Sequence, residues 1–131
     1  AALGARHADV EGRGLLEPLM ETLVAEPVYQ FPTLGLQMTG GDKARRFYEQ
    51  FIEHFLPLRG DVALIGEWVS LDAVAQEYDI WLDVAGEREH HRVLGVLYRD
   101  GRLLGGERVY GSEAFVRRMT GALFDELEPI G

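Results

Sequence analysis

The sequence predicts an α+β fold in which helices come first, an antiparallel sheet follows and a last helix ends the chain. Three observations support this order. Apolar residues recur at helical spacing in the first part of the chain, strand-like runs rich in β-branched and aromatic residues occupy residues 62–110, and Ser112 precedes another helical pattern. Asp100-Gly101 between two of these runs is a strong signal for a tight hairpin.

The first helical pattern spans residues 10–24. Its apolar residues form one helical stripe: Leu15, Leu16, Leu19, Met20, Leu23 and Val24. Pro18 and neighbouring glycines weaken the first half, so we expect a kink or a late start near Gly14. Glu26-Pro27 is expected to end this helix.

The second helix is predicted to begin at Thr39-Gly40-Gly41-Asp42, which resembles a capping box. Its apolar face consists of Ala44, Phe47, Tyr48, Phe51, Ile52 and Phe55. A periodic aromatic face of this kind favours core packing over ligand binding.

Strands are predicted over residues 62–70 and 74–83, followed by the Asp100-Gly101 hairpin. Ser112 can cap the last helix, whose inner side carries Phe115, Val116, Met119 and Leu123. The tail from Asp125 is expected to be solvated. We expect residues 1–131 to form a single domain.

The composition excludes several functional classes. A formal net charge of −9 argues against nucleic acid and anionic membrane surfaces as partners, because both require a surplus of basic residues. The chain has no cysteine, which excludes disulfides and thiolate nucleophiles. No apolar run approaches the roughly 20 residues of a membrane span. We therefore expect a cytoplasmic protein.

The hairpin turn predicts which residues share a face of the sheet. A two-residue turn at Asp100-Gly101 would pair Tyr98 with Leu103 and Leu94 with Glu107. The predicted inner face then includes Arg92, Leu94, Val96, Tyr98, Glu107 and Val109. A carboxylate in such surroundings is costly to ionise without a partner, and Arg92 would lie diagonally within reach. A structural Glu107–Arg92 pair and a functional Glu107 both remain open.

The strand at residues 74–83 carries further acids. Alternation places Gln76, Tyr78, Ile80 and Leu82 on one side and Ala75, Glu77, Asp79, Trp81 and Asp83 on the other. The pattern of apolar residues favours an outward position for the carboxylates but does not decide it.

Three stretches carry a resemblance to a known family. They are Glu26-Pro27-Val28-Tyr29, the helix Gly40-Gly41-Asp42-Lys43-Ala44-Arg45-Arg46-Phe47-Tyr48, and the hairpin with its residues 99–103 and 106–110. In order and spacing they resemble the nuclear transport factor 2-like superfamily, in its SnoaL-like branch. The resemblance implies a cystatin-like cone, in which a strongly curved antiparallel sheet wraps the N-terminal helices and a pocket opens at one end. This fold hosts isomerases, cyclases, dehydratases, lyases, epoxide hydrolases and pure binding domains.

The catalytic positions of these relatives match only in part. The base of ketosteroid isomerases corresponds to Phe31 and their acid falls at or near Leu94, while the aspartate of polyketide cyclases corresponds to Gly111. Limonene epoxide hydrolases fit somewhat better, because their pocket tyrosine corresponds to Tyr29 and one aspartate to Asp79. Their arginine before that aspartate corresponds to Glu77, their pocket asparagine to Phe31, and their second aspartate again to Gly111. The resemblance nevertheless implies that Glu77 and Asp79 face the pocket.

We therefore expect a cofactor-independent acid–base enzyme acting on a small, largely apolar oxygenated molecule, by isomerisation, cyclisation, dehydration, lysis or epoxide hydrolysis. The predicted roles are base for Asp79, acid with a raised pKa for Glu107, hydrogen-bond donor for Tyr29, and proton-transfer residues for Glu77 and His90. The predicted substrate-binding residues are Phe31, Tyr48, Trp68, Trp81, Arg92, Leu94, Val96 and Tyr98. The alternative is a non-catalytic small-molecule-binding or dimerisation domain of the same fold.

Neither a cofactor nor a metal is expected. His90 and His91 are adjacent on a strand and point to opposite faces, so they cannot bind one ion together. A homodimer is expected through the outer sheet face, on an apolar patch of Val93, Leu97, Leu104 and Tyr110.

Overall fold

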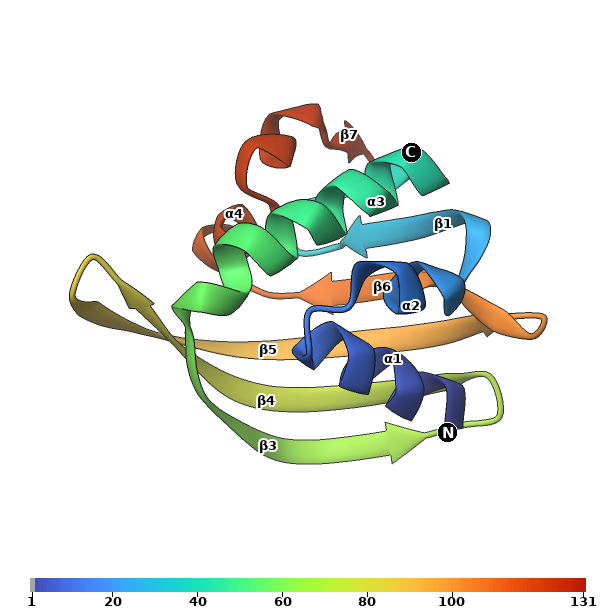
Figure 1. Cartoon of the computed structure of the whole chain (residues 1–131), viewed down its shortest axis with the longest axis horizontal. Coiled ribbons are helices and arrows are strands. Elements are labelled where there is room, and N and C mark those ends of the chain that lie inside the picture. The colour runs from blue at the N-terminus through green and yellow to red at the C-terminus, as the bar shows by residue number, and fades with distance from the viewer. Residues whose placement is uncertain (1) are drawn as a thin grey trace.

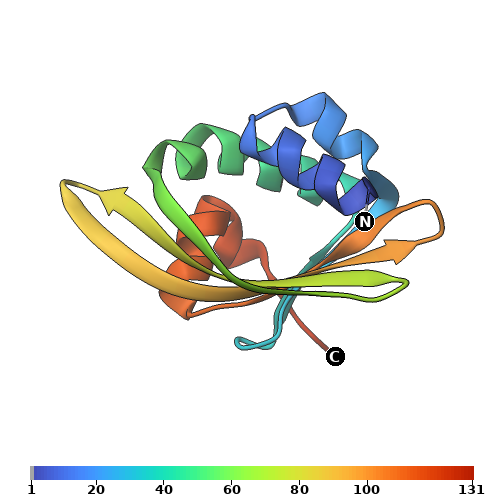
Figure 2. The ribbon, with the colours of Figure 1, turned by 90° about the horizontal axis from the view of Figure 1, so that it is seen from below.

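The computed structural model describes residues 2–131 and forms one curved seven-stranded sheet with helices on its concave side (Figures 1 and 2). The strands are β1 Leu23–Phe31, β2 Leu36–Thr39, β3 Arg59–Val69, β4 Ala73–Val84, β5 Glu87–Asp100, β6 Leu103–Tyr110 and β7 Glu128–Pro129. The α-helices are α1 Ala2–Gly12, α2 Leu16–Glu21, α3 Gly41–Gln50 and α4 Glu113–Thr120. Shorter helical turns are η1 Phe51–Phe55, η2 Leu56–Leu58 and η3 Gly121–Glu126.

The sheet runs in the order β3-β4-β5-β6-β1-β2-β7. Neighbouring strands are antiparallel except β1 and β6, which are parallel. The predicted α+β fold is confirmed, with N-terminal helices, a curved sheet and a short C-terminal helix. The prediction of a purely antiparallel sheet is wrong at this one pair. In the described residues no helix is long and apolar enough to cross a membrane.

The N-terminal segment differs from the predicted helix over residues 10–24. Gly14 adopts a φ of 67°, which favours glycine and separates α1 from α2 near the predicted break. Pro18 lies in the first turn of α2, where its missing N–H removes no helical hydrogen bond. The chain does not stay helical to Glu26, because β1 begins at Leu23 and pairs with β6.

Two predicted helices are confirmed, and they cover the core. Along α3 and η1 the side chains of Ala44, Phe47, Tyr48, Phe51 and Phe55 are buried. The start of α3 has no side-chain cap, because its N-cap is Gly40, so the predicted capping box is wrong. In contrast, Ser112 Oγ accepts a hydrogen bond from the Phe115 N–H at 3.1 Å and caps α4 as predicted.

The predicted register of the β5–β6 hairpin is wrong. Glu107 lies opposite Leu97 instead of Leu94, a shift of three residues. Two of them come from the turn, which lies at Gly101-Arg102 because Asp100 pairs with Leu103, and the third from Gly105, an extra residue between the pairs Arg99–Leu104 and Tyr98–Gly106. Such a β-bulge shifts the pairing by one residue, and every side chain beyond it changes partners. The inner face of β5 therefore carries Val93, Gly95 and Leu97 instead of Arg92, Leu94 and Val96.

This register also removes the predicted dimer patch. Val93 and Leu104 are buried in the core, with relative exposures of 1% and 2%. Exposed apolar side chains are instead concentrated along the edge strand β3, at Val62, Leu64, Ile65, Trp68 and Val69. The C-terminal tail was expected to be solvated; its side chains are exposed, but β7 pairs with β2.

We expect Gly106→Ala to destabilise the fold by about 3 kcal/mol or more, which is the upper range for single substitutions. Gly106 has a φ of 145°, and an added Cβ would lie 1.8 Å from the Val28 carbonyl oxygen. Gly101→Ala is the matched control: its φ is 70° but no atom lies within 4 Å of the added Cβ, so we expect a cost of about 1 kcal/mol. If both variants lost the same free energy of unfolding in urea, the contact between position 106 and the Val28 carbonyl would not be the cause.

Candidate functional site

A cavity of about 340 Å³ lies between α1, η1, α4 and the concave face of the sheet. This volume suits a small organic ligand. Its apolar lining includes Phe51, Phe55, Ile80, Leu97, Phe115 and Met119. Its polar lining consists of His7, Glu11, Arg59, Gln76, Tyr78 and Glu107.

Glu107 is the central polar group of this cavity. It lies on β6 opposite Leu97 of β5, and its carboxyl lies over Gly95, where an added Cβ would come within 3.0 Å of Oε2. Among residues 2–131 no other side chain forms a hydrogen bond or an ion pair with it. Burial raises the pKa of Glu107 well above its ordinary value of 4.5, and the nearby Glu11 carboxylate raises it further. The predicted inward position of a raised acid at Glu107 agrees with this geometry, but its predicted partner Arg92 does not.

Glu11 and His7 lie one turn apart on α1. Glu11 Oε2 is 3.5 Å from His7 Nε2. The His7 side chain is 2% exposed and the Glu11 side chain 28% exposed, so only the carboxylate keeps contact with water. The other ring nitrogen, Nδ1, lies 2.7 Å from Thr22 Oγ1. This pair places a second carboxylate and an imidazole at the cavity that contains Glu107.

Two buried tyrosines extend this group into the core. The Tyr48 hydroxyl lies 3.3 Å from His7 Nε2 and 2.5 Å from the Tyr29 hydroxyl. Burial raises the pKa of both phenols, so both remain protonated. Tyr29 was predicted to donate a hydrogen bond to substrate; instead its hydroxyl is paired with Tyr48 and its side chain is 1% exposed.

Asp79 lies on the outer face of the sheet, against the prediction from the family resemblance. It accepts hydrogen bonds from Arg92 at 2.9 and 3.1 Å, and its Oδ1 lies 2.7 Å from His90 Nε2. Arg92 and then His90 lower the pKa of Asp79 to about 2. The strand follows simple alternation, with Tyr78 and Gln76 lining the cavity and Glu77 on the outer side.

The predicted substrate-binding residues lie away from the cavity. Trp81 stacks on His90 with ring centroids 4.9 Å apart, and the exposed Trp68 lies on the edge strand. Leu94, Val96 and Tyr98 share the outer face with Arg92, and the Tyr98 hydroxyl donates to the Val28 carbonyl at 3.0 Å. Phe31 and Tyr48 are buried in the core. Of all predicted site residues, only Glu107 lines the cavity.

The sequence prediction missed His7, Glu11, Gln76 and Tyr78. One signal was available: residues i and i+4 on a helix lie on the same face, and His7 and Glu11 have this spacing. The sequence pattern predicts a helix only from residue 10, so this spacing does not enter the predicted site. Gln76 and Tyr78 follow from alternation on β4 without any family argument.

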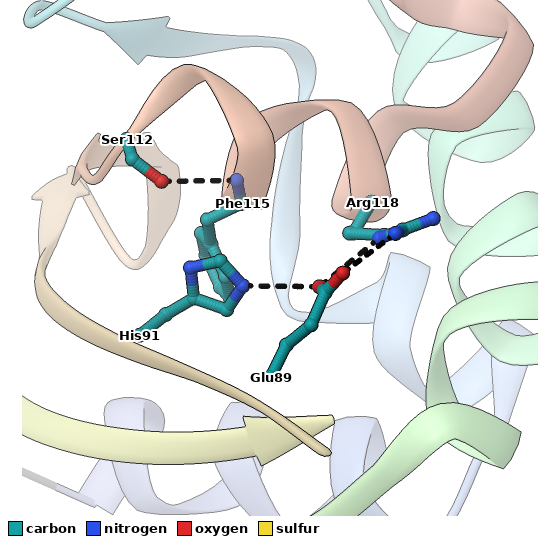
Figure 3. A network of polar contacts seen from close by, with 5 residues as sticks. All are labelled: Glu89, His91, Ser112, Phe115 and Arg118. Carbon is teal, nitrogen blue, oxygen red and sulfur yellow. Dashed lines mark hydrogen bonds and ion pairs between the residues drawn. The ribbon is translucent and has the colours of Figure 1, made fainter. Parts of the chain in front are cut away.

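One end of the cavity depends on a network that joins α4 to β5 (Figure 3). Arg118 forms a bidentate pair with Glu89, with Nη2 at 2.7 Å from Oε2, and His91 Nε2 lies 3.3 Å from Glu89. The His91 ring packs against Phe115 with centroids 5.4 Å apart. These contacts hold Phe115 as part of the apolar wall. His91 thus faces inward while His90 faces outward, and in residues 2–131 no cluster of three His, Asp or Glu residues is arranged to bind a metal.

We expect Glu107→Gln to change how stability depends on pH. A carboxyl with a raised pKa favours the unfolded state once the pH exceeds the ordinary value of 4.5, so the native protein loses stability as the pH rises from there toward the folded pKa. Each unit of elevation corresponds to about 1.4 kcal/mol. In urea unfolding, the free energy of unfolding of Glu107→Gln relative to that of the native protein should increase as the pH rises. The outer-face variant Glu77→Gln should show no such increase. A constant difference across pH would contradict a raised pKa.

The contribution of Asp79 and its partners Arg92 and His90 to stability should depend on pH in the opposite way. Because its pKa is lowered to about 2, its stabilisation is present above about pH 4 and is lost as the pH falls toward 2. Asp79→Asn should therefore be less stable than the native protein near neutral pH and approach it in acid. Thermal unfolding of both proteins across this pH range tests the expectation. A difference in melting temperature that stays constant with pH would refute it.

No family model matches the chain, and no curated protein matches it. Solved structures do resemble it. An NTF2-like protein from Anabaena variabilis has a TM-score of 0.67 at 15% identity, covering 86% of this chain and 88% of that one. A protein with a cystatin-like fold from Silicibacter pomeroyi has a TM-score of 0.68 at 15% identity, covering 95% and 84%.

A protein with a ketosteroid isomerase-like fold from Catenulispora acidiphila, solved in complex with trimethylamine, has a TM-score of 0.64 at 15% identity. The similarity covers 91% of this chain and 92% of that one. At these identities the likeness concerns the fold. The chain therefore has the nuclear transport factor 2-like fold, also described as cystatin-like, that its sequence predicts.

Proposed function

We propose that the protein is a cofactor-independent acid–base enzyme that acts on a small, largely apolar molecule bearing a carbonyl or similar oxygen. The observation that carries this proposal is Glu107: a carboxyl without a protein partner among the described residues, bordering an apolar cavity. A structural carboxyl is normally paired, whereas a perturbed and unpaired one in a cavity is typical of a functional site.

Glu107 in its protonated form is a hydrogen-bond donor to a substrate oxygen. Tyr78 is a second donor at the same cavity, because burial raises the pKa of its phenol and keeps it neutral. The apolar walls formed by Phe51, Phe55 and Leu97 strengthen both interactions by lowering the local dielectric constant.

Enolisation is the simplest reaction that such a cavity supports. A base removes the proton on the carbon next to the carbonyl, the C–H electrons form the C=C bond, and the carbonyl oxygen receives the proton of Glu107. Return of a proton to another carbon gives isomerisation, and loss of a β-substituent gives dehydration or lysis. The rate should fall as the pH rises through the pKa of Glu107, since ionisation removes the donor.

We expect the protein to accelerate deuterium exchange at the α-carbons of cyclohexanone in D₂O, followed by NMR. Glu107→Gln should lower the rate constant by about 100-fold, the usual order for a general acid or base. Glu77→Gln is the matched control: it makes the same change on the outer face of β4 and should stay within about two-fold, since it does not touch the cavity.

The alternative is a non-catalytic small-molecule-binding domain. It is supported by the residues at the positions where relatives have acids, namely Phe31, Leu94 and Gly111. Gly111 even has a structural contact, since Thr33 donates a hydrogen bond to its carbonyl at 2.6 Å. Chemical-shift changes of cavity residues on adding cyclohexanone, without accelerated exchange, would favour this alternative and contradict the enzyme proposal. Equal loss of exchange in Glu77→Gln and Glu107→Gln would contradict the location of the site.

A further inference from the structure

We propose that Glu11 is the proton acceptor of this cavity, and that His7 is a positioning residue which holds it in place. This inference rests on the proposed function and names the group that receives the proton. It replaces Asp79 and His90, which lie on the outer face and are paired there with Arg92 and with each other.

The hydrogen bonds of Thr22 determine the tautomer of His7. The Thr22 hydroxyl donates its single proton to the Leu19 carbonyl at 2.6 Å. Its oxygen must therefore accept at 2.7 Å from His7 Nδ1, which carries a hydrogen. Both Thr22 and His7 are buried, so no water competes for this contact. The nitrogen whose protonation can change is Nε2.

Nε2 lies near a hydroxyl that can donate to it, that of Tyr48, and a carboxylate that can accept from it, that of Glu11. In the neutral ring it accepts from the Tyr48 hydroxyl at 3.3 Å, and Tyr48 accepts in turn from Tyr29 at 2.5 Å. In the protonated ring Nε2–H faces the Glu11 carboxylate at 3.5 Å. His7 thus has a partner in both states, as expected of a residue that responds to a proton on its neighbour.

Glu11 and Glu107 border one cavity in different environments. Glu11 and Glu107 are both half-buried, but the Glu11 carboxylate lies beside the His7 ring, whereas Glu107 has no described partner and burial raises its pKa. Such a pair divides naturally into an ionised base and a protonated acid. The other titratable or charged groups facing this region are Tyr78 from β4, Tyr48 from α3, Tyr29 from β1 and Arg59 at the start of β3.

The proton transfers balance in this arrangement. The C–H bond of the substrate breaks and its proton goes to the Glu11 carboxylate, while the carbonyl oxygen takes the proton of Glu107. At the end of the step Glu11 is neutral and Glu107 is charged. Reversal of the two transfers at another carbon restores both groups without any co-reactant.

The first test is cyclohexanone exchange in Glu11 variants. We expect Glu11→Gln to lower the rate constant by about 100-fold and Glu11→Asp to restore part of it, because a carboxylate is present again. His7→Gln should lower the rate constant in the native background and have little further effect in Glu11→Gln, since His7 acts by holding Glu11. A purely structural role for His7 would lower the rate constant by the same factor in both backgrounds.

The second test requires no turnover: ¹⁵N NMR of the His7 ring. We expect the hydrogen on Nδ1 in the neutral ring, because the Thr22 oxygen accepts there. A hydrogen on Nε2 in the neutral ring would overturn the inference. Full exchange in Glu11→Gln beside lost exchange in Glu107→Gln would also overturn it while leaving the proposed function intact. Full exchange in Glu107→Gln contradicts the proposed function instead.

Discussion

The close approach of β6 to β1 is the constraint on which the site depends. Gly106 pairs with Val28 in a parallel ladder that has no room for a Cβ, and the preceding Gly105 forms the bulge that shifts β6 by one residue against β5. The shift places Glu107 beside Leu97 and sends Arg92 to the other face of the sheet. Without the bulge Glu107 would lie opposite Val96, on the face of β5 that carries Arg92.

Two carboxyl groups of the sheet therefore end in opposite environments. Asp79 has a guanidinium and an imidazole as partners, so its charge is stabilised and it is poorly suited to take up a proton near neutral pH. Glu107 has apolar neighbours and the Glu11 charge, so its neutral form is favoured. A carboxyl side chain thus stabilises the outer face in one case and offers a transferable proton in the other.

Much of the fold could be predicted from the sequence, because α3, α4 and the inner face of β4 follow simple periodicity. The hairpin register could not, since Gly105-Gly106 gives no sign of whether it continues the ladder or forms a bulge. The α1 residues could not be predicted in the same way. Gly12 and Gly14 weaken the helical pattern there, so the predicted helix begins only at residue 10 and does not contain His7. Asp79 was misplaced for another reason: its identity matched that of a relative's catalytic residue, while its own alternation indicated the correct face.

The central claim is that Glu107 is a protonated, unpaired carboxyl at the cavity. Infrared spectroscopy of protein with ¹³C-labelled glutamate side chains tests it most directly, because the C=O stretch of a carboxylic acid is separate from the bands of carboxylates. Near neutral pH we expect one protonated glutamate band that disappears in Glu107→Gln and persists in Glu77→Gln. A spectrum with carboxylate bands alone, or an acid band that survives Glu107→Gln, would contradict the claim.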